Sequence, residues 1–315
     1  MSDRILGLHH VTATVGEAQP DLDFCAGALG LRLVKRTVNF DNRNVYHFYY
    51  GDERGTPGTI WTTFPYAGMG VPRGHFGEGQ VTSTAFSVPT GTLDQWAERL
   101  RRLGITSART EDRFGEPALA VTDPSGLAFE LVASPRDRRG AWIAPDQNPA
   151  AAVRGLHGVT LTVATPDATV ELLTDLLDFR VVAESGNRIR LAAGPDAPGH
   201  TLDLLHGSGA GPARNGIGTV HHVALAAASA EVQRELREAL VARGRHVTEV
   251  LDRQYFQSIY FREPGGVLLE IATVAPGFAV DEPVESLGCG LMLPPWEESQ
   301  RERIEAGLPP IVVPG

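Results

Sequence analysis

Apolar and polar residues alternate along several short stretches of the chain, and helical patterns lie between these stretches. Residues 7–15 (GLHHVTATV), 155–163 (GLHGVTLTV) and 218–226 (GTVHHVALA) alternate with a period of two, which predicts strands with one buried face. Residues 93–104 and 232–244 instead place apolar side chains three and four positions apart, which predicts helices that pack by one side. The pattern therefore predicts an α+β fold of short strands and few helices.

The same order of elements recurs along the chain. An offset of 148 residues relates 7–15 and 29–34 to 155–163 and 177–182, and an offset of 140 residues relates 100–105 and 123–134 to 240–245 and 263–274. We therefore predict four βαβββ units that form two open, barrel-like mixed sheets, at residues 7–66, 79–134, 155–207 and 218–274.

The repeats divide the chain into two halves. Residues 1–134 are predicted to form an N-terminal domain of two units, and residues 154–274 a C-terminal domain of two more. Residues 135–153 are rich in Pro, Arg and Ala and are predicted to link the halves. Residues 275–315 carry several prolines and one short helical stretch, and we expect this extension to pack on the outside.

Composition narrows the classes of function. The chain has 315 residues, 42% of them apolar, so it can bury a substantial core, and its net charge of −10 argues against a nucleic-acid surface. The first residues lack the apolar core of a signal peptide, and no apolar run is long enough to span a bilayer. Cys25 and Cys289 form neither a metal-binding cluster nor a disulfide framework. We expect a soluble, cytoplasmic protein that binds neither nucleic acid nor membranes.

Two of the predicted strands carry adjacent histidines. Neighbouring side chains of a strand point to opposite faces, so each pair can offer one histidine to a given site. In the first strand His9 shares the apolar face that must pack against the helices, which leaves His10 on the polar, concave face. In the later strand His222 shares its face with the small Ala224, which leaves room for a ligand, whereas His221 lies on the apolar face. The second histidine of each pair is therefore the candidate site residue.

A carboxylate, Glu270, stands in the middle of the apolar strand VLLEIAT, where it needs a partner such as a metal ion. The aligned first-strand and last-strand positions of the four units hold His10 and Thr62, Thr82 and Glu130, Gly158 and Leu204, and His222 and Glu270. Only the first and fourth units together supply two histidines and a carboxylate. We therefore predict that these two units share a cup around a metal ion, and that the middle units form a scaffold without metal.

Two neutral imidazoles and one carboxylate on one face of a metal ion are typical of non-heme Fe(II) oxygenases, although catalytic zinc accepts the same ligands. The net charge of such a site, +1, favours an anionic oxygen donor such as a phenolate. His157 occupies the position of His9, so we expect it to have a packing role and not to bind metal. Cys25 is expected to be a buried core residue without a functional role. The remaining histidines are given no role: His47, His75, His200, His206 and His246.

The segments HHVTATV, HHVALA and PGGVLLEIAT resemble the vicinal oxygen chelate superfamily of glyoxalases and extradiol dioxygenases. More narrowly, LGLRLVKRTVNFDN, DRQYFQSIYFREPGG and ESLGCGLMLPPW resemble the ring-cleaving dioxygenases that open hydroquinones and chlorinated hydroquinones. The resemblance implies that His10, His222 and Glu270 ligate iron, in agreement with the argument from strand faces. It also implies catalytic roles for Arg253, Tyr260, His9 and His221. Strict alternation turns the two first histidines away from the cup, so their roles require a β-bulge or an orienting contact with their neighbours.

The resemblance implies an Fe(II)-dependent dioxygenase that opens hydroquinones, substituted or halogenated ones included, and adds both atoms of O2 to the product. Mn(II) or Zn(II) are candidate substitutes for the iron, and we expect a homo-oligomer whose other partners are an aromatic diol and O2. One alternative is a zinc- or nickel-dependent lyase or isomerase like glyoxalase, which usually needs a fourth protein ligand where Thr62 stands. Another is a small-molecule binder without catalysis, whose ligand positions are typically vacant. The choice between 1,2-diols and 1,4-diols stays open.

Overall fold

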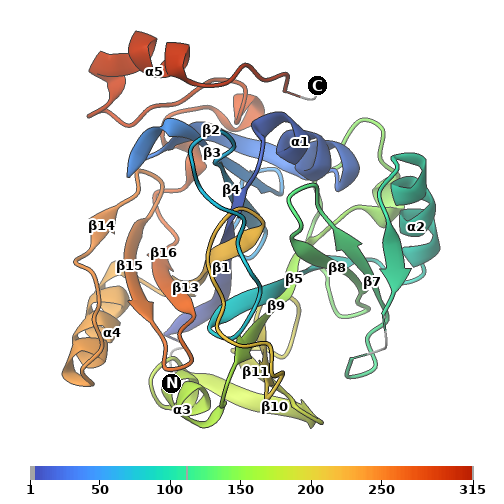
Figure 1. Ribbon diagram of the computed structural model, residues 1–315, viewed down its shortest axis with the longest axis vertical. Coiled ribbons are helices and arrows are strands. Elements are labelled where there is room, and N and C mark those ends of the chain that lie inside the picture. Colours follow the sequence, from blue (N-terminus) through green and yellow to red (C-terminus); the bar gives the residue numbers. More distant parts are fainter. Residues whose placement is uncertain (1–3, 111–112, 314–315) are drawn as a thin grey trace.

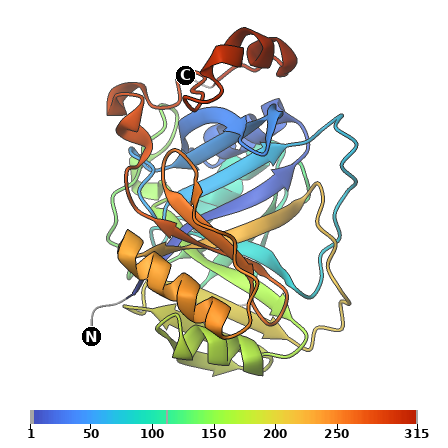
Figure 2. The ribbon, with the colours of Figure 1, turned by 90° about the vertical axis from the view of Figure 1, so that its left-hand side faces the viewer.

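The computed structural model describes residues 4–110 and 113–313, which form two eight-stranded mixed sheets (Figures 1 and 2). The first sheet runs in the order β14 (Leu251–Asp252), β15 (Gln257–Arg262), β16 (Leu268–Thr273), β13 (Thr219–Ala227), β1 (Ile5–Val15), β4 (Ile60–Pro65), β3 (Asn42–Gly51) and β2 (Arg32–Asn39). The second runs in the order β10 (Phe179–Ser185), β11 (Arg188–Ala193), β12 (Thr201–His206), β9 (Gly155–Val163), β5 (Gln80–Val88), β8 (Ala128–Ala133), β7 (Ala118–Thr122) and β6 (Ser107–Arg109).

The sheet order confirms the predicted pairing of repeat units. Strand β1 of the first unit lies antiparallel to β13 of the fourth, and β5 of the second unit lies antiparallel to β9 of the third. Each sheet therefore joins one unit from each half of the chain. As a result, the first and fourth units, far apart in the sequence, lie side by side in the first sheet.

The helices lie on the outside of the sheets (Figures 1 and 2). They are α1 (Ala18–Leu22), which continues as a π-helix over Asp23–Ala28, α2 (Leu93–Arg102), α3 (Asp167–Asp175), α4 (Ala230–Ala242) and α5 (Arg301–Gly307). Short 3-10 turns cover Pro149–Ala151, Phe278–Val280, Val284–Ser286 and Glu298–Gln300. In α4 the Ser229 side chain caps the first turn by accepting from the Val232 amide, while Leu236 and Leu240 are buried against the sheet. None of the helices in the described part of the chain has the length and apolar character needed to cross a membrane.

Residues 275–313 pack on the outside of the first sheet (Figure 1). Lys35 of β2 is completely buried, and its ammonium group pairs with Asp281 at 2.6 Å and with Glu282 at 2.5 Å. Phe278 packs against Tyr49 and Tyr255. Since an unpaired buried charge is costly, these two carboxylates hold the extension against the sheet.

Two β-bulges lie at the histidine pairs. In the β1–β13 ladder, Leu8 pairs with Leu225 and His10 pairs with the adjacent Ala224, so His9 is the extra residue. On the opposite strand His222 pairs with Thr12 while the next pair skips His221, which is therefore a second extra residue. A bulge places two consecutive side chains opposite one partner residue and breaks strict alternation. A role of His9 and His221 in the cup required a β-bulge in each strand, and both bulges are present.

Strand pairing in the second sheet corrects two of the aligned positions. In the β5–β9 ladder the extra residues are Thr82 and His157, so Ser83, and not Thr82, is the counterpart of His222. Glu270 pairs with Ala224, two positions beyond His222, and the corresponding pair in the third unit joins Thr160 to Asp203. The aligned last-strand position of that unit therefore holds Asp203, and the assignment of Leu204 is wrong by one residue. The sequence alignment missed the shift from Thr82 to Ser83 because a bulge changes register without changing residue type. The β9–β12 ladder that places Asp203 has no bulge.

Candidate active site

Side chains from three adjacent strands converge on one point in the first sheet. His10 Nε2 on β1 lies 3.2 Å from His222 Nε2 on β13, and Glu270 Oε2 on β16 lies 3.2 Å and 2.9 Å from these two nitrogens. All three residues are at least 95% buried. Three donor atoms about 3 Å apart match neighbouring ligands on one face of an octahedral ion with bonds of about 2.1 Å. They form the one His, Cys, Asp and Glu cluster with metal-binding geometry among the described residues.

The protonation of the His10 side of the cluster follows from a short chain of contacts. His9 Nε2 lies 3.2 Å from the Thr273 carbonyl oxygen, which can only accept, so this nitrogen carries the proton. Burial and the neighbouring His10 lower the pKa of His9 to about 3, so its Nδ1 keeps a lone pair. His10 Nδ1, 2.9 Å away, must then donate to it. His10 therefore directs the bare lone pair of Nε2 at the cluster, as a metal ligand requires.

The other two members of the cluster are also held by neighbours. His221 Nδ1 lies 2.8 Å from His222 Nδ1, which repeats the arrangement in the first pair. Ser258 on β15 donates its hydroxyl proton to Glu270 Oε1, whereas the buried Oε2 lacks a conventional hydrogen bond within the described residues. Burial alone would raise the pKa of Glu270, but positive charge on the adjacent His10 and His222 holds it well below its usual 4.5. When both imidazoles are neutral, a bound cation would supply that charge. A buried, ionised oxygen facing nitrogen lone pairs is suited to a cation, so the residues present fit a divalent metal ion.

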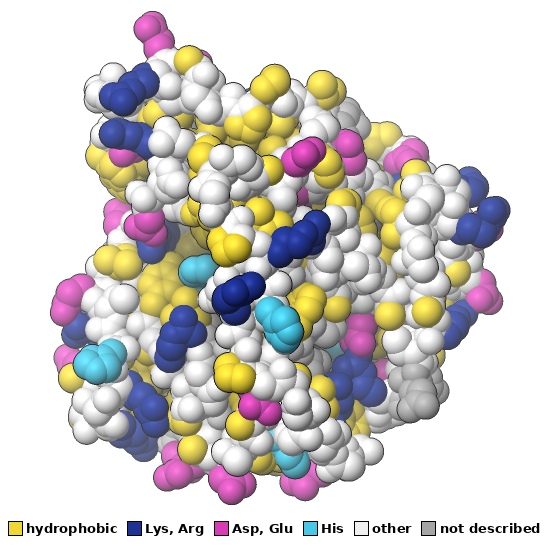
Figure 3. All heavy atoms as spheres, viewed as in Figure 1, with side chains coloured by type: hydrophobic (Ala, Val, Ile, Leu, Met, Phe, Trp, Pro, Cys, Tyr) yellow, Lys and Arg dark blue, Asp and Glu magenta, His cyan; other side chains and the backbone are white. Residues whose placement is uncertain are grey.

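His10 and His222 line a cavity of about 450 Å³ between the first and fourth units, and Glu270 lies beside both histidines. The cavity wall combines aromatic and polar side chains, among them Phe40, Tyr49, Phe64, Phe256, Arg253 and Tyr260. Figure 3 shows hydrophobic side chains gathered in a hollow beneath the C-terminal segment, over strands β14 to β16. The volume lies within the range of small-molecule sites.

The structure brings the two further residues implied by the resemblance, Arg253 and Tyr260, into this cavity. Tyr260 stands directly opposite Glu270 in the β15–β16 ladder, and its ring lies 5.6 Å from that of His222. Arg253 Nε donates to the Tyr260 hydroxyl at 3.2 Å, and the guanidinium also pairs with Asp41 at 3.3 Å across the cavity. Burial and the Glu270 carboxylate raise the pKa of Tyr260 well above 10, so the phenol keeps its proton. Since its oxygen accepts from Arg253, that proton remains available to a ligand.

Three residues of the first unit that the sequence left without a site role also meet here. His47 on β3 lines the cavity, and its Nε2 lies 2.9 Å from Thr62 Oγ1 on β4. Thr62 in turn donates to Thr12 Oγ1 at 2.9 Å. The alternating segment YHFYY places His47 and the cavity residue Tyr49 on one face of a strand, which is the signal that could have identified His47. Thr62, at the last-strand position, is thus engaged in a hydrogen-bonded chain.

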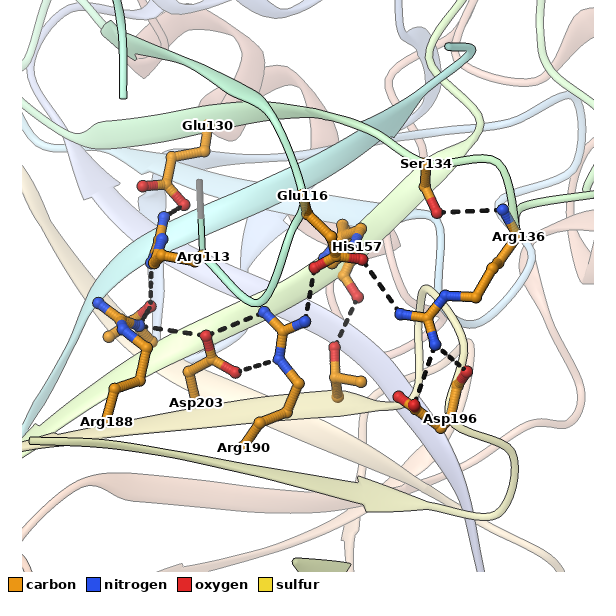
Figure 4. A network of polar contacts seen from close by, with 12 residues as sticks. Arg113, Glu116, Glu130, Ser134, Arg136, His157, Arg188, Arg190, Asp196 and Asp203 are labelled. Atoms are coloured by element: carbon orange, nitrogen blue, oxygen red, sulfur yellow. Dashed lines mark hydrogen bonds and ion pairs between the residues drawn. The ribbon is translucent and has the colours of Figure 1, made fainter. Parts of the chain in front are cut away.

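The equivalent cup of the second sheet is occupied by arginine side chains (Figure 4). Glu130, the counterpart of Glu270, pairs with Arg113. Asp203 accepts from Arg190 at 2.7 Å and 3.1 Å and from Arg188 at 3.1 Å. Guanidinium groups thus supply the positive charge that these carboxylates need. In the first cup the carboxylate instead faces two imidazoles.

The buried His157 of the second cup contacts Glu116. His157 Nε2 lies 3.0 Å from Glu116 Oε1, and Arg190 pairs with the other carboxylate oxygen. His157 occupies the bulge position of His9 but meets a side-chain carboxylate where His9 meets a backbone carbonyl. It is therefore a structural counterpart of His9 outside the candidate metal cluster.

Comparisons with known proteins cover both halves of the chain. The sequence profile described as "Glyoxalase/Bleomycin resistance protein/Dioxygenase superfamily" matches residues 7–131 and 155–271. The chain is 42% identical over 313 residues to the Bacillus subtilis protein named "Putative ring-cleaving dioxygenase MhqO", with 99% of each chain covered. It is 35% identical to the "Chlorohydroquinone/hydroquinone 1,2-dioxygenase" of Sphingobium indicum, with 96% of each chain covered. The crystal structure of a "putative dioxygenase" from Bacillus subtilis has a TM-score of 0.94 and 42% identity, with 99% of each chain covered.

Proposed function

Because the chain belongs to the glyoxalase, bleomycin resistance protein and dioxygenase superfamily, we propose that it is a ring-cleaving dioxygenase that opens hydroquinones with O2. Likeness over almost the full chain to the chlorohydroquinone/hydroquinone 1,2-dioxygenase supports this substrate class. The observation that carries the proposal is the convergence of His10, His222 and Glu270 beside a cavity of about 450 Å³ that both histidines line.

The proposed metal is Fe(II), held by His10 Nε2, His222 Nε2 and Glu270 Oε2, with Mn(II) or Zn(II) as candidate substitutes. When bound, this ion supplies the redox chemistry that joins an electron-rich aromatic ring to O2. Three protein donors on one face leave coordination positions for both reactants. His9 and His221 would act as positioning residues, since each contacts the Nδ1 of the neighbouring ligand.

The side chains above the cluster are suited to a phenolic substrate. Arg253 is cationic, because Tyr260 and Asp41 raise the pKa of its guanidinium although burial opposes the charge. It would stabilise negative charge on the substrate oxygen, and the Tyr260 hydroxyl would donate a hydrogen bond or pass its proton to that oxygen. The rings of Phe64 and Phe256 on the cavity wall would pack against the aromatic substrate and exclude water.

The contacts of Thr62 argue against a glyoxalase-like activity. A lyase or isomerase of that type would use a fourth protein ligand at this position, and a threonine hydroxyl does not replace a carboxylate. In this chain the hydroxyl is also committed to Thr12 and His47. The three donors that converge in the first cup likewise argue against a binder without metal.

Oxygen uptake by the iron-loaded protein tests the proposal. After anaerobic reconstitution with Fe(II), we expect hydroquinone or methylhydroquinone to consume one O2 per diol, and ¹⁸O2 to place both labelled atoms in the ring-opened product. His222→Ala should lose both iron and turnover, whereas His246→Ala, at an exposed position, should keep both. If no diol, catechol included, consumes oxygen while the protein binds zinc stoichiometrically, the assignment is wrong.

A further inference from the structure

His47 lies on the wall of the cavity and belongs to neither histidine pair. Its ring packs against those of Tyr49 and Phe64, with centroid distances of 4.0 Å and 4.2 Å. Both neighbours line the same cavity. These contacts fix the plane of the imidazole, so its two nitrogens have defined directions.

The hydrogen bonds behind the ring determine which nitrogen carries the proton. The Thr62 hydroxyl has a single proton, and it donates this proton to Thr12. Thr62 can therefore only accept from His47 Nε2, 2.9 Å away. Burial and the nearby His10 and His222 lower the pKa of His47 well below 6.5, so the ring is neutral. His47 thus carries its proton on Nε2 and a lone pair on Nδ1, to which none of the described residues donates.

We propose that His47 Nδ1 accepts a hydrogen bond from the substrate hydroxyl that lies away from the metal, and that this contact selects 1,4-diols. This inference rests on the proposed function. In a 1,2-diol both oxygens can reach one ion. In a 1,4-diol the second hydroxyl lies too far from the ion to bind it and can donate to an acceptor on the cavity wall, which His47 lines. Arg253 offers donors alone, whereas His47 is fixed as an acceptor by Thr62. His47 is therefore a specificity-determining residue.

Two ligands that differ in whether the second oxygen can donate a hydrogen bond test the inference. We would titrate the Zn(II)-loaded protein anaerobically, by calorimetry, with hydroquinone and with 4-methoxyphenol, whose ether cannot donate. The wild-type protein should prefer hydroquinone by about fivefold to tenfold, the effect of one neutral hydrogen bond. His47→Phe keeps an aromatic ring between Tyr49 and Phe64, and it should remove the preference by weakening hydroquinone binding alone. Thr62→Val, which frees the tautomer of His47, should reduce the preference as well.

Tyr66→Phe is the matched control, because the Tyr66 hydroxyl lines the same cavity but already accepts from Asn39 at 3.0 Å. It should leave the preference intact. The inference is overturned if the wild-type protein has no preference, if His47→Phe retains it, or if His47→Phe weakens both ligands equally. Because these titrations measure binding to a redox-inert metal, they are independent of the oxygen-uptake assay on which the proposed function depends.

Discussion

Replacing His9 by phenylalanine should weaken the metal site without removing a ligand. The Thr273 carbonyl fixes the tautomer of His9, and His9 Nδ1 in turn accepts from His10 Nδ1 at 2.9 Å. Phenylalanine fills a similar volume and can keep the ring contact with Phe256, whose centroid lies 4.9 Å away. It cannot, however, accept a hydrogen bond from His10. His10 would therefore lose the contact that directs its Nε2 lone pair at the ion.

Loss of such an orienting partner costs about 10- to 100-fold in metal affinity, which corresponds to about 1.4–2.7 kcal/mol. The N–H of His10 left buried without an acceptor should lower the free energy of unfolding by about 1–3 kcal/mol. Competition with a chromophoric chelator for Zn(II) would measure the affinity, and chemical unfolding of the metal-free protein would measure the stability.

The second sheet provides a matched control for this prediction. His157→Phe changes the equivalent bulge residue and breaks the contact with Glu116, so it should also destabilise the protein. Since His157 contacts no candidate ligand, metal affinity should stay within about twofold of the wild-type value. The reasoning is refuted if His9→Phe binds metal as tightly as the wild type, or if His157→Phe weakens binding to the same extent.

Three further predictions concern other parts of the chain. Burial raises the pKa of Asp21 from 3.8 to about 7. The free energy of unfolding should therefore fall as pH rises between these two values, by at most about 1.4 kcal/mol per pH unit. The Asp21→Asn variant should lack this pH dependence. Lys35→Met leaves Glu282 buried without its cation, so limited proteolysis should cut the residues from 275 onward faster than in the wild type. Unchanged cleavage would contradict the role of this ion pair. Tyr260→Phe removes the proton donor beside the cluster and should lower kcat at least tenfold while metal stoichiometry stays at one, so an unchanged kcat would exclude that role.

Much of the fold could be predicted from the sequence because the repeats preserve the order and polarity of the elements. The resemblance of the histidine and glutamate strands to the vicinal oxygen chelate superfamily is confirmed by the family profile and the full-length relatives. The pairing of the first and fourth units followed from a count of ligand types, since no other pair of units supplied His10, His222 and Glu270 together. The structure confirms that pairing.

The remaining features depend on register and three-dimensional contact, which a residue pattern does not encode. Strict alternation placed His9 and His221 on the wrong face of the sheet, because one extra residue in each strand reverses the face to which its side chain points. The same shift led to Thr82 being assigned where Ser83 stands. The site contacts of His47 depend on hydrogen bonds and stacking between strands, so its histidine type alone gave no reason to select it.

Anomalous diffraction at the iron absorption edge would locate the metal in the iron-loaded protein and so test whether the three side chains bind one ion. We predict one anomalous peak per chain, in contact with His10 Nε2, His222 Nε2 and a carboxylate oxygen of Glu270. A peak elsewhere, for example beside Glu130 and Asp203 in the second cup, or a peak bound by fewer than all three of these side chains, would contradict a metal site built from His10, His222 and Glu270.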